Sequence, residues 1–141
     1  MYVAMNRFRV RREAEAAFEA MWLNREVYLH REPGFVEFHM LKGSTVEETE
    51  EVEAHRLYVS HTVWRSEKDF LAWTRSDSFR RAHSQAGRKP ADAKPLYIGG
   101  PSFEGYAAIQ IVDGEGTASV DHERLADGVA LDSDGSSSEA A

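Results

Sequence analysis

The chain has 141 residues and a formal net charge of −7, with 24 acidic side chains, 17 basic side chains and no cysteine. This length fits one domain, and the absence of cysteine excludes disulfides, iron–sulfur clusters, thiolate catalysis and cysteine-ligated zinc or haem. No apolar stretch approaches the roughly 20 residues that span a bilayer, and the first ten residues do not have the form of a signal peptide. We therefore expect a cytoplasmic protein without a membrane segment.

The negative charge is concentrated at the C-terminus. Residues 1–112 hold 16 acidic and 16 basic side chains, whereas residues 113–141 hold eight acidic side chains and one arginine. No basic excess remains to indicate nucleic-acid binding. Residues 113–141 also lack a sustained apolar period and are rich in Gly, Ser, Asp and Ala. We therefore expect a folded domain over 1–112 and a disordered acidic tail over 113–141.

The N-terminal half predicts three strands and a helix. Residues 2–10 alternate with period two, which is typical of a strand and places Asn6 on the same face as Ala4, Phe8 and Val10. Apolar residues recur at helical spacing from residue 12 to about 31, and Pro33-Gly34 ends that helix. Strands are expected over 35–42 and 54–64, paired antiparallel across an acidic loop at 43–53.

The C-terminal half predicts two short helices and a final strand. Ser66 and Asp69 resemble a capping box that begins a helix over about 67–74, and a second helix follows over about 77–85. Residues 96–98 and 103–112 supply the remaining strand material. The order βαββααβ predicts an α+β domain with a ferredoxin-like antiparallel sheet and helices on one face.

The segment from Thr62 to His83 carries the most specific pattern. It contains a strand that ends in Val63-Trp64 and two helices with Phe70, Trp73, Ser76-Asp77, Phe79 and Ala82-His83. Together with Asn6 and with Pro33-Gly34-Phe35 after the first helix, this segment resembles the haem-degrading monooxygenases of the IsdG type. They belong to the antibiotic-biosynthesis-monooxygenase superfamily, whose fold is a dimeric α+β barrel. The resemblance covers residues 1–112.

The resemblance implies roles for three residues. His83 would be the axial ligand of the haem iron, Trp73 would press on the porphyrin and distort it, and Asn6 would help to orient dioxygen on the distal side. Haem would be both substrate and cofactor, with O2 and an external electron donor, either a reductase or a small reductant. Since the superfamily barrel is built from two chains, we expect a homodimer. Its interface would cover apolar strand residues that are otherwise left partly exposed: Val3, Met5, Val59, Val63 and Ile109.

The chemistry of haem agrees with this assignment. A haem pocket needs apolar walls, an axial donor and cations near the propionates. Phe79 lies four residues before His83 and shares a helix face with it, so both could contact haem. Several basic residues flank the histidine, and we favour Arg88 and Lys89 for the propionates because they follow its helix directly.

Simpler interpretations remain open. A lone helical histidine is more often a surface residue than a ligand, and a lone tryptophan more often belongs to a core. His55 and His61 share a strand face but lie roughly 20 Å apart, which makes joint metal ligation improbable; His39 is expected to face solvent. The alternatives to haem degradation are a cofactor-independent monooxygenase for a phenolic or quinol substrate and a haem carrier without turnover.

Overall fold

The computed structural model describes residues 1–25, 29–86 and 94–131. The chain divides into two compact units, Met1–Tyr106 and a second unit that begins at Ala107. No helix in the described ranges is long and apolar enough to cross a membrane.

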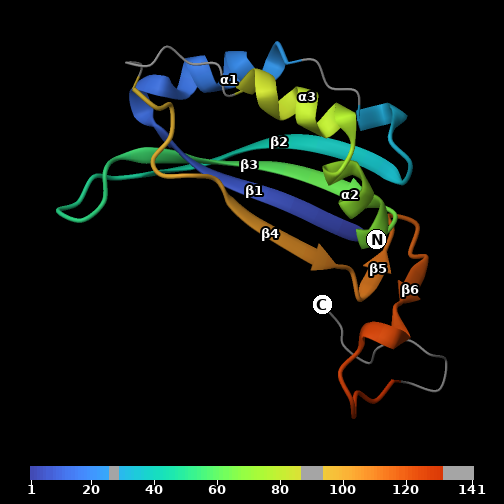
Figure 1. The fold of residues 1–141 in the computed structure, drawn as a ribbon. Coiled ribbons are helices and arrows are strands. Elements are labelled where there is room, and N and C mark those ends of the chain that lie inside the picture. The colour runs from blue at the N-terminus through green and yellow to red at the C-terminus, as the bar shows by residue number, and fades with distance from the viewer. Residues whose placement is uncertain (26–28, 87–93, 132–141) are drawn as a thin grey trace. The chain divides into compact units, whose positions relative to one another are not determined.

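The first unit is a four-stranded sheet with its helices on one face (Figure 1). The strand order is β2-β3-β1-β4, and β3 pairs antiparallel with both β1 and β2. This arrangement confirms the expected α+β class, while the dimeric barrel stays a prediction. The strands are β1 (Tyr2–Arg11), β2 (Phe35–Val46), β3 (His55–Trp64) and β4 (Ser102–Ala107), and the helices are α1 (Glu15–Leu23), α2 (Glu67–Thr74) and α3 (Asp77–Ala86).

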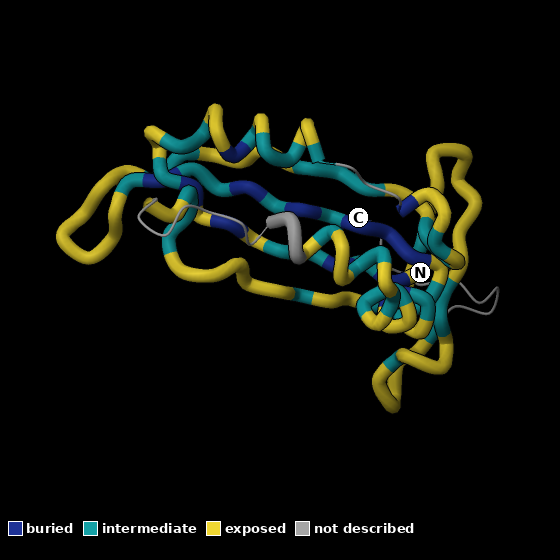
Figure 2. Tube along the Cα trace, turned by 45° about the horizontal axis from the view of Figure 1, so that its top comes forward, coloured by how far each residue is buried: buried dark blue, intermediate teal, exposed yellow. Residues whose placement is uncertain are grey.

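The core lies between the two central strands and α1. Alternation along β1 buries Ala4, Phe8 and Val10 on the helix side, as the period-two pattern predicted. Phe18 of α1 packs on Tyr58 of β3 with ring centroids 4.7 Å apart. Figure 2 shows the buried positions along the central strands. The sheet is therefore held to its helices by one aromatic cluster.

The first helix is shorter than the sequence predicted. A 3-10 turn occupies Arg12–Ala14, α1 ends at Leu23, and a separate 3-10 turn occupies Leu29–Arg31. The side-chain amide of Asn24 donates to the carbonyl oxygen of Ala20 at 2.8 Å, and the Asn24 backbone N–H donates to the same oxygen at 3.0 Å. Asn24 thus caps α1 with two bonds to one carbonyl oxygen, a local feature that apolar periodicity does not contain.

A glycine turn and a helix cap connect the sheet to α2. Gly34 has a φ of 80°, and its carbonyl oxygen accepts from the Arg65 backbone N–H at 2.8 Å. A Cβ atom at position 34 would overlap the side chain of Asp69, so glycine is required on two grounds. The predicted Ser66 cap is confirmed, because the Asp69 backbone N–H donates to Ser66 Oγ at 3.1 Å. The Asp69 carboxylate accepts from the Ser66 hydroxyl at 3.0 Å and not from the Ser66 backbone N–H, so the reciprocal half of a capping box is not formed.

Two strand boundaries differ from those expected. Strand β2 continues to Val46, past the expected end at residue 42, because an irregularity in its pairing with β3 between Lys42 and Thr45 absorbs Gly43 and lets the ladder resume. The stretch 103–112, expected as one run, forms the end of β4 and then a separate strand, β5 (Gln110–Val112).

The second unit contains a hairpin that the composition did not predict. Strand β5 pairs antiparallel with β6 (Ala118–Val120), and a 3-10 turn follows at His122–Arg124. Asp113 Oδ1 accepts from the backbone N–H groups of Glu115 and Thr117, at 2.9 and 2.8 Å. Hydrogen bonds from the turn to the Asp113 side chain thus order a segment that has no periodic apolar residues. The expectation of disorder from residue 113 is wrong for this hairpin. Residues 132–141 of the expected tail lie outside the described residues, and the domain boundary at 112 stays a prediction.

Candidate active site

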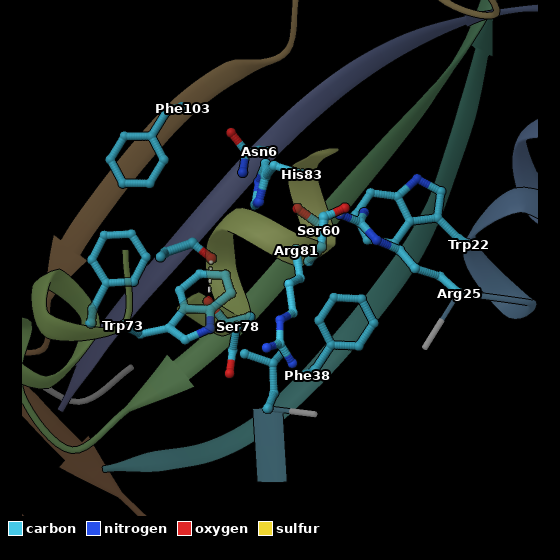
Figure 3. Close-up of a pocket in the computed structure, with 15 residues that line it drawn as sticks. Asn6, Trp22, Arg25, Phe38, Ser60, Trp73, Ser78, Arg81, His83 and Phe103 are labelled. Atoms are coloured by element: carbon cyan, nitrogen blue, oxygen red, sulfur yellow. Dashed lines mark hydrogen bonds between the residues drawn. The ribbon is translucent and has the colours of Figure 1, made fainter. Parts of the chain in front are cut away.

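A cavity of about 350 Å³ lies on the helix side of the sheet (Figure 3). This volume is within the range of about 300–1,000 Å³ that small-molecule sites occupy. Its polar side chains come from both the strands and the helices: Asn6, Arg25, Ser60, Thr62, Ser78, Arg81 and His83. Its apolar walls are largely aromatic: Ala4, Trp22, Leu29, Phe38, Phe70, Trp73, Ala82 and Phe103.

The three residues singled out by the sequence all line this cavity. Asn6 comes from β1, Trp73 from α2 and His83 from α3. The rings of Trp73 and His83 meet edge to face with centroids 6.4 Å apart. The fold therefore brings an amide, an indole and an imidazole to one apolar cavity, while their catalytic roles stay predictions.

A backbone hydrogen bond orients the imidazole of His83. Its Nδ1 atom lies 2.8 Å from the carbonyl oxygen of Phe79, one helical turn earlier in α3. A carbonyl oxygen only accepts, so Nδ1 carries the proton of this bond. In the neutral ring the lone pair is then on Nε2, which leaves this nitrogen able to bind a metal ion.

Phe79 is not among the residues that line the cavity. Its ring packs on His83 with centroids 3.9 Å apart, and it meets Trp73 edge to face at 4.8 Å. The side chain thus fixes two cavity rings from one position. Its expected direct contact with haem stays a prediction.

Trp73 is supported on its other side by the protein core. Its ring centroid lies 5.5 Å from that of Trp64, whose side chain is fully buried. The Trp64 indole donates to Thr62 Oγ1 at 3.0 Å, and the Thr62 hydroxyl donates to the Ala4 carbonyl oxygen at 3.2 Å. The position of Trp73 therefore depends on a satisfied buried network that reaches β1.

Asn6 projects from the floor of the cavity. It lies in β1 opposite Ser60 of β3, and both side chains line the cavity. No hydrogen bond joins its side-chain amide to another residue of the described ranges. A neutral amide that can donate and accept without titrating is thereby available to a ligand.

Arg25 is a cavity residue that the sequence interpretation missed. Its guanidinium lies 4.6 Å from the centre of the Trp22 ring and donates to the carbonyl oxygen of Ala82 at 2.8 Å. Burial lowers the pKa of Arg25 from its usual value, although an arginine remains charged. The i,i+3 spacing from Trp22 was the signal that could have identified it.

The other basic residues near His83 are placed unevenly. Arg81 lines the cavity, as the sequence permitted without favouring it. Arg88 and Lys89, the favoured partners of the propionates, lie outside the described residues. Arg25 and Arg81 are thus the two cations that line the cavity within the described ranges.

Trp22 lines the cavity with its ring, while its indole N–H is enclosed by the protein. Trp22 stacks on Phe38 with an interplanar angle of 19°, and its Nε1 atom is buried without a hydrogen-bond partner among the described residues. A buried donor of this kind is costly unless an acceptor reaches it. Flat aromatic walls, an imidazole nitrogen with a free lone pair and two cations are together compatible with a large planar ligand that carries acidic groups.

Comparison with known sequences identifies relatives. A family model described as antibiotic biosynthesis monooxygenase matches residues 1–85. The chain is 37% identical over 59 residues to a heme oxygenase (staphylobilin-producing) from Staphylococcus haemolyticus (strain JCSC1435), covering 42% of this chain and 54% of that protein. It is 36% identical over 78 residues to a heme-degrading monooxygenase from Shouchella clausii (strain KSM-K16), covering 55% of this chain and 63% of that protein. The matches thus span between half and two thirds of these relatives.

Solved structures support the same fold. A variant of MhuD with two manganese protoporphyrin IX bound per active site superposes with a TM-score of 0.56 at 24% identity, over 81% of this chain and 100% of that one. MhuD from Mycobacterium tuberculosis with two hemes bound in its active site gives 0.54 at 23% identity, over 80% of this chain and 100% of that one. At these identities the likeness establishes the fold. Since the family model covers more than half of the residues, the chain belongs to the antibiotic biosynthesis monooxygenase family.

Proposed function

We propose that this chain is a haem-degrading monooxygenase that binds haem through His83 and opens the porphyrin with O2 and an external electron donor, releasing iron. The observation that carries the proposal is the orientation of His83. Its Nδ1 atom is held by the Phe79 carbonyl, and its ring lines a cavity shared with Asn6 and Trp73. The two curated relatives, named as haem-degrading enzymes, support the same substrate.

The residues present fit haem. Nε2 of His83 would hold the iron, and the hydrogen bond at Nδ1 raises the basicity of that ligand. The aromatic walls, among them Trp73 and Phe38, would bury the faces of the macrocycle. Arg25 would receive a propionate by its charge.

The protein would contribute ligation, distortion of the macrocycle and one polar contact. Haem, when bound, supplies the redox-active iron and the macrocycle that is oxidised. Trp73, locked between Trp64 and Phe79, would press on the macrocycle because its own ring cannot retreat. Asn6 would donate its amide N–H to an oxygen atom of the co-substrate without changing its own protonation.

Haemin titration followed by reduction tests the proposal. Purified protein should bind haemin with a Soret shift, and ascorbate in air should then abolish the Soret band and release ferrous iron to a chelator. His83→Ala should lose both responses, whereas His122→Ala, in the second unit, should keep them. Stable haemin binding without loss of the band would instead indicate a carrier. Absent haemin binding, with quinol oxidation unaffected by His83→Ala, would indicate the cofactor-independent alternative.

We also infer a homodimer built on the sheet face opposite the helices. Strand alternation places Val3, Met5, Val59 and Val63 on that face. Val3, Met5 and Val59 are only partly buried there, and Leu41 of β2 is 45% exposed. Burial of this apolar face against a second copy would remove it from water. Sedimentation equilibrium should give twice the mass of one chain, and a monomeric mass at all concentrations would contradict the inference.

A further inference from the structure

Two histidines form a pair on the sheet face opposite the cavity. His39 of β2 and His61 of β3 are direct partners in the antiparallel register. Because Ser60 and Thr62 line the cavity, strand alternation directs His61 to the other face. The Nδ1 atoms of the two rings lie 3.2 Å apart. The sequence did not predict this pair, since it compared His61 with a histidine of the same strand.

The separation of the two nitrogens suits metal coordination. Zinc–imidazole bonds of about 2.0–2.1 Å at a tetrahedral angle place two ligand nitrogens about 3.3 Å apart. The observed 3.2 Å matches this separation, and each ring would turn about its side-chain bonds to aim its lone pair at the ion. In the metal-free pair one ring must donate a proton and the other accept it, so a lone pair already points to the space between them. To bind an ion through both Nδ1 atoms, the donating ring would carry its proton on Nε2 instead, as the accepting ring already does when neutral.

A carboxylate lies at the far side of one ring. Glu37 Oε2 is 3.7 Å from Nε2 of His39. Histidines that bind metals usually direct their second nitrogen to such an acceptor, which orients the ring and offsets the ionic charge. In the single chain the side chains of His39 and Glu37 are 43% and 57% exposed. In the proposed homodimer this face would meet the same face of a second copy, whose pair could share the ion.

We propose that His39 and His61 form a binding site for a divalent transition-metal ion such as Zn²⁺, with Glu37 in support. Imidazole ligands favour Zn²⁺, Cu²⁺ and Ni²⁺ over Mg²⁺ or Ca²⁺. Within the described residues no group of three or more His, Cys, Asp or Glu side chains surrounds a common point, so two protein ligands leave coordination positions for water or for the same pair of a second copy. This site is separate from the haem cavity.

Zinc titration of the full chain tests the site. Calorimetry with Zn²⁺ should give saturable binding that weakens at least tenfold in His39→Ala and in His61→Ala. Glu37→Gln should weaken it by about tenfold, the lower end of the range for supporting residues. His30→Ala, which changes an exposed histidine of the Leu29–Arg31 turn, should bind as the unmodified chain does.

Stoichiometry and folding controls complete the test. One ion per chain indicates an open site and one ion per two chains a shared site, and both support the proposal. His61→Gln, which keeps a polar side chain, and circular dichroism of each variant separate loss of the ligand from loss of the fold. The proposal is overturned if the unmodified chain shows no saturable binding below about 1 mM, which corresponds to about 4 kcal/mol. It is also overturned if folded His39→Ala and His61→Ala proteins bind as tightly as the unmodified chain.

Discussion

The guanidinium of Arg25 donates to the backbone carbonyl oxygen of Ala82 at 2.8 Å, which ties the segment after α1 to the helix that carries His83. We predict that Arg25→Gln weakens haemin affinity roughly tenfold, equivalent to about 1.4 kcal/mol. The variant loses a charge near the propionates and loosens α3. Arg25→Lys keeps the positive charge but not the planar guanidinium, so its haemin affinity should lie between those of Arg25→Gln and the unmodified chain. Spectral titration measures both, and unchanged affinity in Arg25→Gln would contradict this role.

Asn6 should affect turnover more than binding. Asn6→Ala is expected to keep haemin affinity within about threefold and to slow the ascorbate-dependent loss of the Soret band by roughly a hundredfold, the cost typical of losing one preorganised donor. Ser60→Ala is the matched control, because Ser60 lies opposite Asn6 in the register and also lines the cavity. If Ser60→Ala slows the loss of the Soret band as much as Asn6→Ala does, the effect is not specific to the Asn6 amide and the prediction is contradicted.

Phe79 should act through its two neighbours. Phe79→Leu removes the ring that packs on both Trp73 and His83, and we expect a loss of about 1–2 kcal/mol in the free energy of unfolding for this half-buried side chain. Haemin affinity should fall as well, because His83 is no longer held. Chemical denaturation and spectral titration measure the two effects. A stable variant with unchanged haemin binding would show that Phe79 positions neither ring.

Thr62 should contribute stability through its hydroxyl. Thr62→Val leaves the buried Trp64 Nε1 atom without an acceptor and the Ala4 carbonyl without this donor. An unsatisfied buried polar group costs about 1–3 kcal/mol, and the free energy of unfolding should fall by that amount. Thr62→Ser keeps the hydroxyl and should lose clearly less. If the valine variant unfolds at the same denaturant concentration as the serine variant, the network is not stabilising.

Tyr58 and Glu19 give the stability a dependence on pH. The Tyr58 hydroxyl donates to Glu19 Oε2 at 2.5 Å, and this bond, followed by that from Lys42, lowers the pKa of Glu19. A carboxyl with a lowered folded-state pKa stabilises the fold above its unfolded pKa, and the contribution disappears as the pH falls through the folded value. Tyr58→Phe should therefore unfold more easily at neutral pH and approach the unmodified chain in acid. Thermal melting measures the effect. An equal difference in melting temperature between Tyr58→Phe and the unmodified chain at neutral and at acidic pH would contradict this coupling.

Local patterns in the sequence predicted most of the first unit. The alternation of β1 and the Ser66 cap of α2 depend only on residues close in the sequence, so both could be predicted without knowledge of the tertiary structure. The end of α1 was missed because Asn24 caps the helix through its side-chain amide, a feature that apolar periodicity does not contain. The Asp113 hairpin was missed for a similar reason, because its turn is stabilised by side-chain acceptors.

The site could be predicted only where a motif named its residues. Asn6, Trp73 and His83 were found because the resemblance to haem-degrading enzymes identified them, and the structure brings them to one cavity. The contact of Arg25 with Ala82 joins residues 57 positions apart. The His39–His61 pair likewise depends on the register of β2 against β3. Neither contact has a local pattern in the sequence. Contacts between residues far apart in the chain therefore could not be predicted.

The position of Asn6 and Ser60 on the two central strands has a consequence for ligand accommodation. Both are anchored in a continuous ladder from Tyr2 to Arg11 against His55 to Trp64, whereas His83 and Trp73 are carried by two short helices. A bound ligand would therefore contact a rigid sheet on one side, and on the other side helices α2 and α3, which can shift to accommodate it. Amide protons of β1 and β3 should exchange slowly with deuterium whether or not the cavity is filled, and those of α3 should become protected only when a guest occupies it.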